Sequence, residues 1–578
     1  MAEQRYYFFK NKLAMGPATY WDLVALLLIF GVIALLAIGT KQMTVPYHFG
    51  QTLSVSLDPG YLPEYALRTV LRMFYALGFS LLFTFIFGAW AAKSKRAGQI
   101  IIPMIDILQS VPVLAFLSIA IVGFINLFQG SLLGPEAAAI FVIFTAQAWN
   151  MVLSFYQSMR TVPSDLLEVA EMYHLSPWRR FWRVEVPFAL PGLLWNTMMS
   201  MSASWFFVVA CEAITVNNQT ISLPGIGSYI ALAIEKANSI AVLNAILTMF
   251  VVIVLYDQLI FRPLNKWIEK FKIDPASRES PPRTWLTKLL HRSHVIKYMS
   301  HFFGVLTDTI VNLPLFNVKK SRPHAVHPKF AKYFGIVWNI SIVVLVLLAI
   351  WAVIHFIANN VTVGEMLHVI LLGLATAARV FAVIIFCTAV WVPIGVWIGQ
   401  KPRLTQIVQP IIQFLAAFPA YLLFPVVVIL IVKFHLNVQI WVTPLMILGT
   451  QWYVAFNVIA GTSAIPKELS LAVDSFGVKG KLKWQKFIFP AVFPYYITGA
   501  ITAVGGAWNT SIVAEVVHWG NTSLTATGLG AYITHYAAEG DYARIGLGIT
   551  VMCAYVLVLN RLIWRPLYQF AEKRFRLD

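Results

Sequence analysis

Long runs of apolar residues recur along the chain, six on each side of a polar stretch near its middle. A helix needs about 20 such residues to cross a bilayer core that is about 30 Å thick. The pattern therefore predicts an all-α integral membrane protein with about 12 transmembrane helices. The runs before the polar stretch are 21–39, 68–92, 101–127, 136–160, 188–213 and 239–261. The runs after it are 333–357, 370–399, 407–433, 438–462, 491–517 and 543–564.

The second half of the chain repeats the first at an offset of 303 positions, or 307 near the start of each half. The matching residues are Trp149 with Trp452, Trp205-x6-Glu212 with Trp508-x6-Glu515, and Thr69-x2-Arg72 with Thr376-x2-Arg379. Six spans, an even number, give both copies the same orientation, so we expect parallel repeats with a pathway between them. The predicted organisation is a first repeat over 1–262, a linker over 263–332 and a second repeat over 333–578.

Composition and charge agree with a membrane protein and assign its sides. Hydrophobic residues make up 59% of the chain and charged ones only 12%, with a net charge of +18. With the N-terminus inside, 36 of the 43 Lys and Arg lie in the linker, the termini and the loops on the inner side. This bias predicts cytoplasmic termini and explains the basic excess without nucleic acid. The first run has no small-residue cleavage site after it, which favours a retained helix over a signal peptide.

Two loops on the predicted cytoplasmic side, 163–192 and 466–494, each begin with a short amphipathic helix. Pro163 and Pro466 start these helices, and acidic residues occupy their first turns. The predicted helices span 163–175 and 466–478. A loop of this length that carries its own exposed helix is typical of a docking element.

These loops resemble the EAA loop of permease subunits of bacterial ABC importers with the type I fold. Other patterns, such as Thr-x2-Arg and Trp-x6-Glu, are similar to the nitrate, sulfonate, taurine and bicarbonate branch. The resemblance implies coupling helices that dock on two ABC ATPase subunits, a solute-binding protein outside the membrane, and a bacterial inner membrane location. It also implies a small anion as substrate. The implied coupling residues are Glu168, Ala170, Glu171, His174, Pro187, Ala472, Asp474, Gly477 and Pro490.

The chain departs from the family pattern in three ways. Family members are usually single six-helix subunits that dimerise, whereas this chain contains two fused copies. The motif glycine is replaced by His174 in the first repeat, where a tight helix end would need a positive φ that histidine seldom adopts. The motif glutamate is replaced by Leu471 in the second repeat. We therefore expect the two docking helices to be unequal.

The sequence contains no Walker A motif, so the chain is not expected to hydrolyse ATP; ATP and Mg²⁺ would bind to partner subunits. We find no catalytic set and no metal-ligand spacing. A rival hypothesis is a 12-helix secondary transporter coupled to an ion gradient, which would need acidic or basic residues in mid-span. A membrane scaffold or intramembrane enzyme is a further rival.

Polar residues within spans are candidates for the pathway or its gate, because lipid does not solvate them. Arg72, Arg379, Glu212 and Glu515 fall near the outer ends of their spans. They form either an outer gate that favours anions or interhelical bridges that hold the scaffold. The weaker candidates are Trp205, Trp508, Trp149, Trp452 and Asn150, and the prolines expected to kink the third spans are Pro103, Pro112, Pro410 and Pro419.

The linker contains apolar residues at helical spacing between Trp285 and Ile310, next to several basic residues. This pattern suits an amphipathic helix on an anionic membrane surface. A solvated connector explains it equally well.

Overall fold

The computed structural model describes residues 20–47, 53–109, 111–216, 219–261, 263–264, 292–312 and 328–575. Contacts divide the chain into two units. Unit 1 comprises 1–43, 154–196 and 255–335, and unit 2 comprises 44–153, 197–254 and 336–578. Among the described residues, nine helices are long and apolar enough to cross a membrane, or ten if one bent pair counts as a single span. The predicted all-α membrane fold is confirmed, while nine or ten spans among the described residues are fewer than the 12 expected from the sequence.

Unit 1 contains the first long helix, the first docking loop and the linker helix. Its elements are α2 (Tyr20–Met43), α8 (Ser164–Met172), α9 (Pro177–Arg180), the π-helical turn η4 (Phe181–Glu185) and α15 (His294–Asn312). Two long helices, α7 (Leu133–Arg160) and α10 (Val186–Cys211), continue from this unit into unit 2. The predicted linker helix is therefore present over 294–312, while positions 285–291 lie outside the described residues.

Unit 2 contains most of the spans. Its first-repeat elements are η1 (Pro59–Tyr61), α3 (Leu62–Phe83), η2 (Thr84–Gly88), α4 (Ala89–Lys93), α5 (Lys95–Leu108), η3 (Val113–Phe116), α6 (Leu117–Leu127), β1 (Ala213–Val216), β2 (Gln219–Ser222), α11 (Ile226–Glu235) and α12 (Ser239–Tyr256). Its second-repeat spans are α17 (Val363–Gly399), α18 (Pro402–Ala417), η9 (Ala420–Leu423), α19 (Phe424–Lys433), α20 (Val438–Ser463), α23 (Phe489–Ala514) and α25 (Tyr542–Leu559). The latter part of α16 (Pro328–Asn360) also belongs here.

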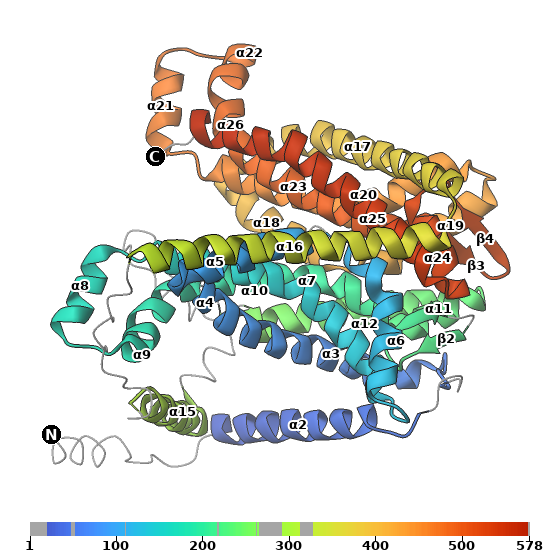
Figure 1. Cartoon of the computed structure of the whole chain (residues 1–578), viewed down its shortest axis with the longest axis horizontal. Coiled ribbons are helices and arrows are strands. Elements are labelled where there is room, and N and C mark those ends of the chain that lie inside the picture. Colours follow the sequence, from blue (N-terminus) through green and yellow to red (C-terminus); the bar gives the residue numbers. More distant parts are fainter. Residues whose placement is uncertain are drawn as a thin grey trace. The chain divides into compact units, whose positions relative to one another are not determined.

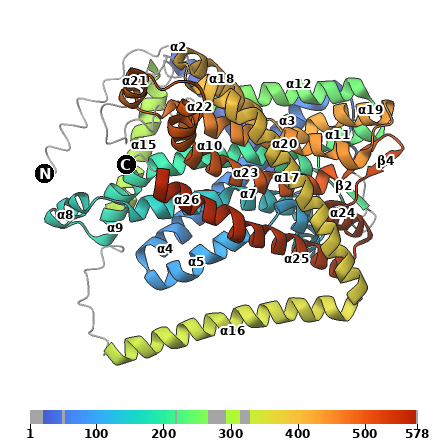
Figure 2. The same ribbon diagram turned by 90° about the horizontal axis from the view of Figure 1, so that it is seen from above.

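The core of unit 2 forms where α20 packs against α17 and α23, and α25 packs against α17. These helices run alongside one another in Figures 1 and 2. The remaining elements of the second repeat are α21 (Lys467–Ser475), α22 (Gly480–Lys483), η10 (Trp484–Ile488), β3 (Val516–Trp519), β4 (Thr522–Thr525), α24 (Leu529–Glu539), η11 (Asn560–Trp564) and α26 (Arg565–Phe575). Because α23 begins after α22 and ends at β3, the docking loop and the hairpin lie at opposite ends of this span.

The structure repeats at the same offset as the sequence. The pairs α8 and α21, α10 and α23, β1 and β3, and α12 and α25 each begin 303 positions apart. Even the π-helical turns recur, since η4 matches η10 and η5 (Asp257–Phe261) matches η11. The short hairpins and the helices α11 and α24 that follow them are not among the predicted elements. They occupy the connections between the fifth and sixth spans.

The third span of each repeat is broken rather than continuous. In the second repeat, α18 and the helical stretch that begins at Ala420 are bent by 83° relative to one another. Pro419 lies in the break there, directly before η9, and Pro112 directly precedes η3 in the first repeat. Proline removes a backbone donor and disfavours helix in the residue before it, so two prolines mark the breaks. The other two, Pro103 and Pro410, lie inside α5 and α18.

Candidate functional site

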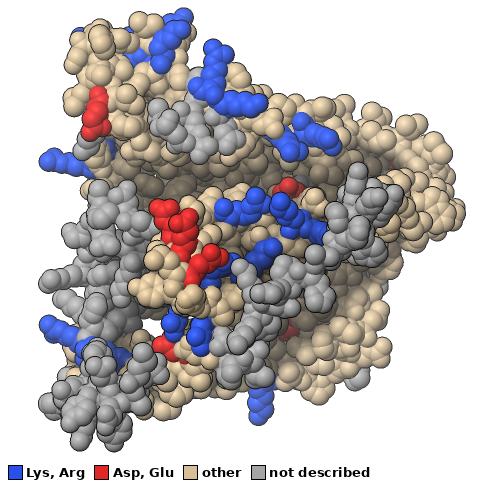
Figure 3. Space-filling view, turned by 60° about the vertical axis from the view of Figure 1, so that its left-hand side comes forward, with Lys and Arg blue, Asp and Glu red and all other residues tan. Residues whose placement is uncertain are grey.

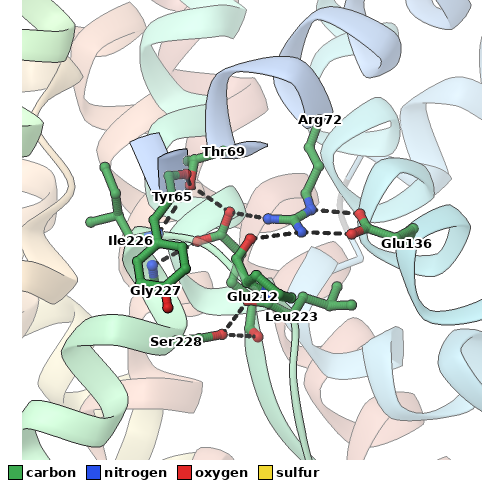
Figure 4. A network of polar contacts seen from close by, with 10 residues as sticks. Tyr65, Thr69, Arg72, Glu136, Glu212, Leu223, Ile226, Gly227 and Ser228 are labelled. Carbon is green, nitrogen blue, oxygen red and sulfur yellow. Dashed lines mark hydrogen bonds and ion pairs between the residues drawn. The ribbon is translucent and has the colours of Figure 1, made fainter. Parts of the chain in front are cut away.

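A buried ion cluster joins α3, α7 and the end of α10 in the first repeat (Figure 4). The guanidinium of Arg72 donates to both oxygens of Glu136, from Nε at 2.6 Å and from Nη2 at 2.7 Å. Its Nη1 donates to Oε1 of Glu212 at 2.6 Å, and its Nη2 also reaches the carbonyl oxygen of Pro224 at 3.0 Å. The three charged side chains are at most 1% exposed. Paired, hydrogen-bonded charges of this kind tolerate burial, whereas isolated ones do not.

The Glu212 carboxylate also holds the chain that follows the first hairpin. Its Oε1 accepts from Thr69 Oγ1 at 2.7 Å, and its Oε2 accepts from the backbone N–H of Gly227 at 2.6 Å. A Cβ on Gly225 would lie 2.3 Å from this carboxylate, so the position requires glycine for close approach. The carboxylate therefore fixes the start of α11.

The second repeat builds the same cluster with one substitution. Arg379 Nη1 donates to Glu515 Oε1 at 2.9 Å and to the carbonyl of Thr527 at 2.8 Å. Its Nη2 donates to Oε1 of Gln439 at 2.7 Å. Gln439 stands 303 positions after Glu136, so an amide replaces a carboxylate. Arg72 thus faces two carboxylates and Arg379 only one, and the Arg379 side chain is 10% exposed.

These contacts match the scaffold alternative for the four charged residues. Each guanidinium is engaged by acceptors from its own repeat, and each glutamate is buried against a helix start. Thr376 repeats the role of Thr69, donating to Glu515 at 2.9 Å. All three nitrogens of each guanidinium donate to protein acceptors.

The aromatic pathway candidates divide by burial. Trp205 and Trp508 are each 1% exposed and belong to the protein interior. Trp149 and Trp452 are half-buried; the Trp149 ring contacts Phe83 with centroids 5.8 Å apart. Asn150 is exposed. The structure does not gather these five residues into one site.

A direct hydrogen bond connects the two repeats within unit 2. The backbone N–H of Val113, at the break in the first repeat's third span, donates to Oδ1 of Asn509 in α23 at 2.7 Å. The position of α10 equivalent to Asn509 is Phe206. Asn509 is not among the residues predicted from the sequence, although an amide within a membrane span is a visible signal.

A cavity of about 560 Å³ lies between the two repeats beside the hairpins. Its wall combines the first hairpin, the C-terminal end of α11, α19 and β3. Lys236 and Glu235 line it together, so opposite charges stand side by side. Burial lowers the pKa of His518 in the wall, which keeps its imidazole neutral at pH 7. A cavity of this size accommodates a small solute.

The two predicted coupling helices are present as α8 and α21, and both end in the same way. After α8, His174 has a φ of +51°, and after α21, Gly477 has a φ of +66°. The backbone N–H of Leu175 donates to the carbonyl of Ala170, and that of Val478 to the carbonyl of Val473. This is the Schellman closure of a helix. Histidine therefore occupies the left-handed position that the motif normally gives to glycine.

An ion pair braces each coupling helix against the next short helix. Asp474 in α21 contacts Lys483 in α22 at 2.5 Å, and Glu171 in α8 contacts Arg180 in α9 at 3.9 Å. Asp474 lies 303 positions after Glu171, and Lys483 lies 303 positions after Arg180, so the two ion pairs are equivalent. The pairs are partly exposed, so each contributes little stability by itself.

Large apolar side chains project from both coupling helices. Tyr173 and Phe476, at equivalent positions, are 77% and 84% exposed. Ala170 is buried, whereas Glu168 and Ala472 are exposed. Pro187 and Pro490 each occupy the second position of the following span. Figure 3 brings forward the end of unit 2 that carries α21 and α22, and lysine and arginine side chains appear on it in blue.

Glu136 is not among the residues predicted from the sequence either. It is an acid in the first turn of a long helix, a position that the helix dipole alone explains. Comparing the repeats would have singled out Glu136, because its counterpart is an amide.

Comparison with known proteins places this architecture in a family. Residues 84–265 and 391–577 match the family described as binding-protein-dependent transport system inner membrane component. The trimethylamine N-oxide transport system permease protein TmoV of Pelagibacter ubique is 27% identical over 206 residues, which cover 36% of this chain and 27% of TmoV.

Two further relatives carry other substrates in their names. The bicarbonate transport system permease protein CmpB of Synechocystis is 28% identical over 112 residues, 19% of this chain and 37% of CmpB. The nitrate import permease protein NrtB of Leptolyngbya laminosa is 28% identical over 162 residues, 28% of this chain and 53% of NrtB. The chain thus spans less than two thirds of the length of these relatives. Since the family match covers more than half of the chain and occurs once in each repeat, the chain belongs to the family of inner membrane components of binding-protein-dependent transport systems.

Proposed function

We propose that this chain supplies both halves of the membrane pathway of an ATP-driven importer. The observation that carries the proposal is the pair of coupling helices, α8 and α21, which share one geometry and expose an aromatic residue at the same position. Each helix would dock on one ABC ATPase subunit, and closure of the ATPases would move the attached spans. The coupling residues named from the sequence lie in these helices, directly after them, or at the starts of the spans that follow.

The proposed orientation places both termini, the linker and the coupling helices in the cytoplasm of a bacterium. The support is the excess of Lys and Arg in these segments. The hairpins and the cavity of about 560 Å³ then face outward, where a solute-binding protein would deliver its cargo. ATP and Mg²⁺ would bind to the ATPases. An ion-coupled secondary transporter finds no support in the family match.

For the substrate we propose a small anion, in keeping with the relatives named for nitrate and bicarbonate. The paired arginines no longer support this choice, because protein acceptors engage both of them. A small zwitterion is a second candidate, favoured by the relatives named for trimethylamine N-oxide and glycine betaine. Titrating the associated binding protein with nitrate, bicarbonate and glycine betaine by calorimetry separates the two classes.

The docking proposal is tested by purifying the full chain from its native membranes. We expect an ABC ATPase to co-purify with the unaltered chain and to be lost from the double variant Tyr173→Glu, Phe476→Glu. Tyr61→Glu is the control, because Tyr61 is also an exposed tyrosine but lies in η1, far along the chain from either loop. An active preparation without an ATPase, or a double variant that keeps it fully, would contradict the proposal.

A further inference from the structure

The linker helix α15 is fastened to the first long helix by one carboxylate. Asp22 Oδ1 accepts from the backbone N–H of His294 at 2.5 Å, from that of Val295 at 3.1 Å and from the hydroxyl of Ser293 at 2.9 Å. Asp22 Oδ2 lies 3.1 Å from His294 Nδ1. The Asp22 side chain is buried and caps the N-terminus of a helix that begins 272 positions later in the chain. This is an N-cap supplied by another helix.

The cap fixes the depth of α15 relative to a membrane. The helix α2 is not among the nine long apolar helices counted above, but its 24 residues extend about 36 Å at 1.5 Å per residue, enough to cross a bilayer core of about 30 Å. Asp22 lies in the first turn of α2. A carboxylate there belongs at the boundary between headgroups and hydrocarbon. The N-terminus of α15 must therefore lie at the same boundary.

The direction of α15 places the rest of the helix along that boundary. In Figure 1, α2 lies in the plane of the picture while α15 is seen nearly end-on next to the beginning of α2. In Figure 2, α15 is seen from the side and runs across the direction of the long helices of its unit. The helix thus crosses the end of α2 rather than continuing along it.

One face of α15 is apolar and open. Tyr298, Val305 and Leu306 follow a helical spacing of i, i+7 and i+8 and are 55%, 42% and 44% exposed. Lys297, Ser300 and Asp308 occupy the opposite arc. A helix of this kind, lying at a membrane boundary, is typical of an interfacial element whose apolar face enters the headgroup region by about 5–10 Å.

We propose that α15 is a membrane-surface helix whose apolar face rests in the phospholipid leaflet next to the start of α2. The surrounding sequence adds attraction for anionic lipid, because 262–332 contains 14 Lys and Arg against four Asp and Glu. Which leaflet is involved rests on the orientation in the proposed function. The contact with lipid itself requires only that α2 spans the membrane.

The C-terminal end of α15 reaches the first docking loop. Arg183, in η4, lies 3.7 Å from Asp308 and 3.4 Å from Oδ1 of Asn312. The equivalent residue of the second repeat is Lys486. If α15 rests in the leaflet, its contacts with Arg183 would hold the first docking loop close to the membrane surface.

Spin labels on the full chain in phosphatidylethanolamine and phosphatidylglycerol bilayers test the proposal. Single cysteines are introduced by Tyr298→Cys and Leu306→Cys, with Ser300→Cys and Thr307→Cys as matched controls, after the three native cysteines have been replaced. We expect the labels at 298 and 306 to collide more with oxygen, which concentrates in lipid, than with a water-soluble nickel complex. The controls should show the reverse.

Two outcomes would overturn the proposal. If all four labels collide mainly with nickel, α15 is a solvated helix. If the labels at 298 and 306 are shielded from both reagents, a protein surface covers this face instead of lipid. Neither outcome depends on ATPase binding, so a failure here is distinguishable from a failure of the proposed function. An unchanged gel-filtration profile for each variant confirms that the chain is folded.

Discussion

Arg72 and its two carboxylates illustrate how a charged residue in a span can be structural. The sequence indicated polar residues near the outer ends of the spans. It left open whether they form a gate for the solute or bridges that hold the helices together. Distances of 2.6–2.7 Å to both glutamates and near-complete burial favour the bridges. The third partner, Glu136, could not be assigned from the sequence because its place in space depends on how α7 packs against α3.

Removing the arginine should be far more harmful than neutralising one glutamate. Arg72→Met leaves two carboxylates buried without a counterion, and breaking a buried pair costs about 3–5 kcal/mol. Glu136→Gln instead reproduces the second repeat, where Gln439 accepts from Arg379 at 2.7 Å. We expect a large fall in the melting temperature of purified protein for Arg72→Met and a small one for Glu136→Gln. Equal effects would show that the charge of Glu136 is itself required.

Gly225 gives a second prediction at this scale. An added methyl group would meet the Glu212 carboxylate at 2.3 Å, and overpacking of this kind costs about 1–3 kcal/mol. Gly225→Ala should therefore lower the melting temperature. Gly78→Ala is the matched control, because nothing lies within 4 Å of an added Cβ there and alanine favours helix. If Gly225→Ala leaves the melting temperature unchanged, Glu212 can move aside without loss of stability.

Among the elements, the coupling helices were the most predictable and the broken spans the least. The helices begin at the proline and acidic signals, and the glycine position of the motif does adopt a positive φ. The breaks in the third spans were expected as kinks, since proline alone does not reveal how far a helix will bend. The hairpins were missed because strands of four residues leave too short a pattern to recognise.

The unequal helix ends predict unequal local stability. A non-glycine residue in the left-handed region costs about 1–2 kcal/mol, so His174→Gly should stabilise the end of α8. Gly477→Val should destabilise α21 by a similar amount. This is equivalent to a rise of roughly fivefold or more in the equilibrium constant for local unfolding of α21. Hydrogen exchange measured by mass spectrometry reports both. Slower exchange in α21 of Gly477→Val would contradict the assignment of these helix ends.

At the scale of the whole molecule, the repeat at an offset of 303 positions was the most informative feature of the sequence. The offset by itself predicted the duplication, and the elements, the ion pairs of the docking loops and the family match all recur at about that spacing. What the sequence did not reveal is where the copies differ in their contacts. The differences themselves, Gln439 in place of Glu136 and Asn509 in place of Phe206, are visible in the sequence, but the hydrogen-bond partners of these residues are not.

Because both permease units are in one chain, we predict a specific stoichiometry for the complex. A single copy presents two coupling helices and should bind two ATPase subunits. Native mass spectrometry of the complex, purified from native membranes in mild detergent, measures this directly. We expect one copy of this chain with two ATPase subunits. A complex that contains two copies of this chain for each pair of ATPases would contradict the claim that one chain forms the whole pathway.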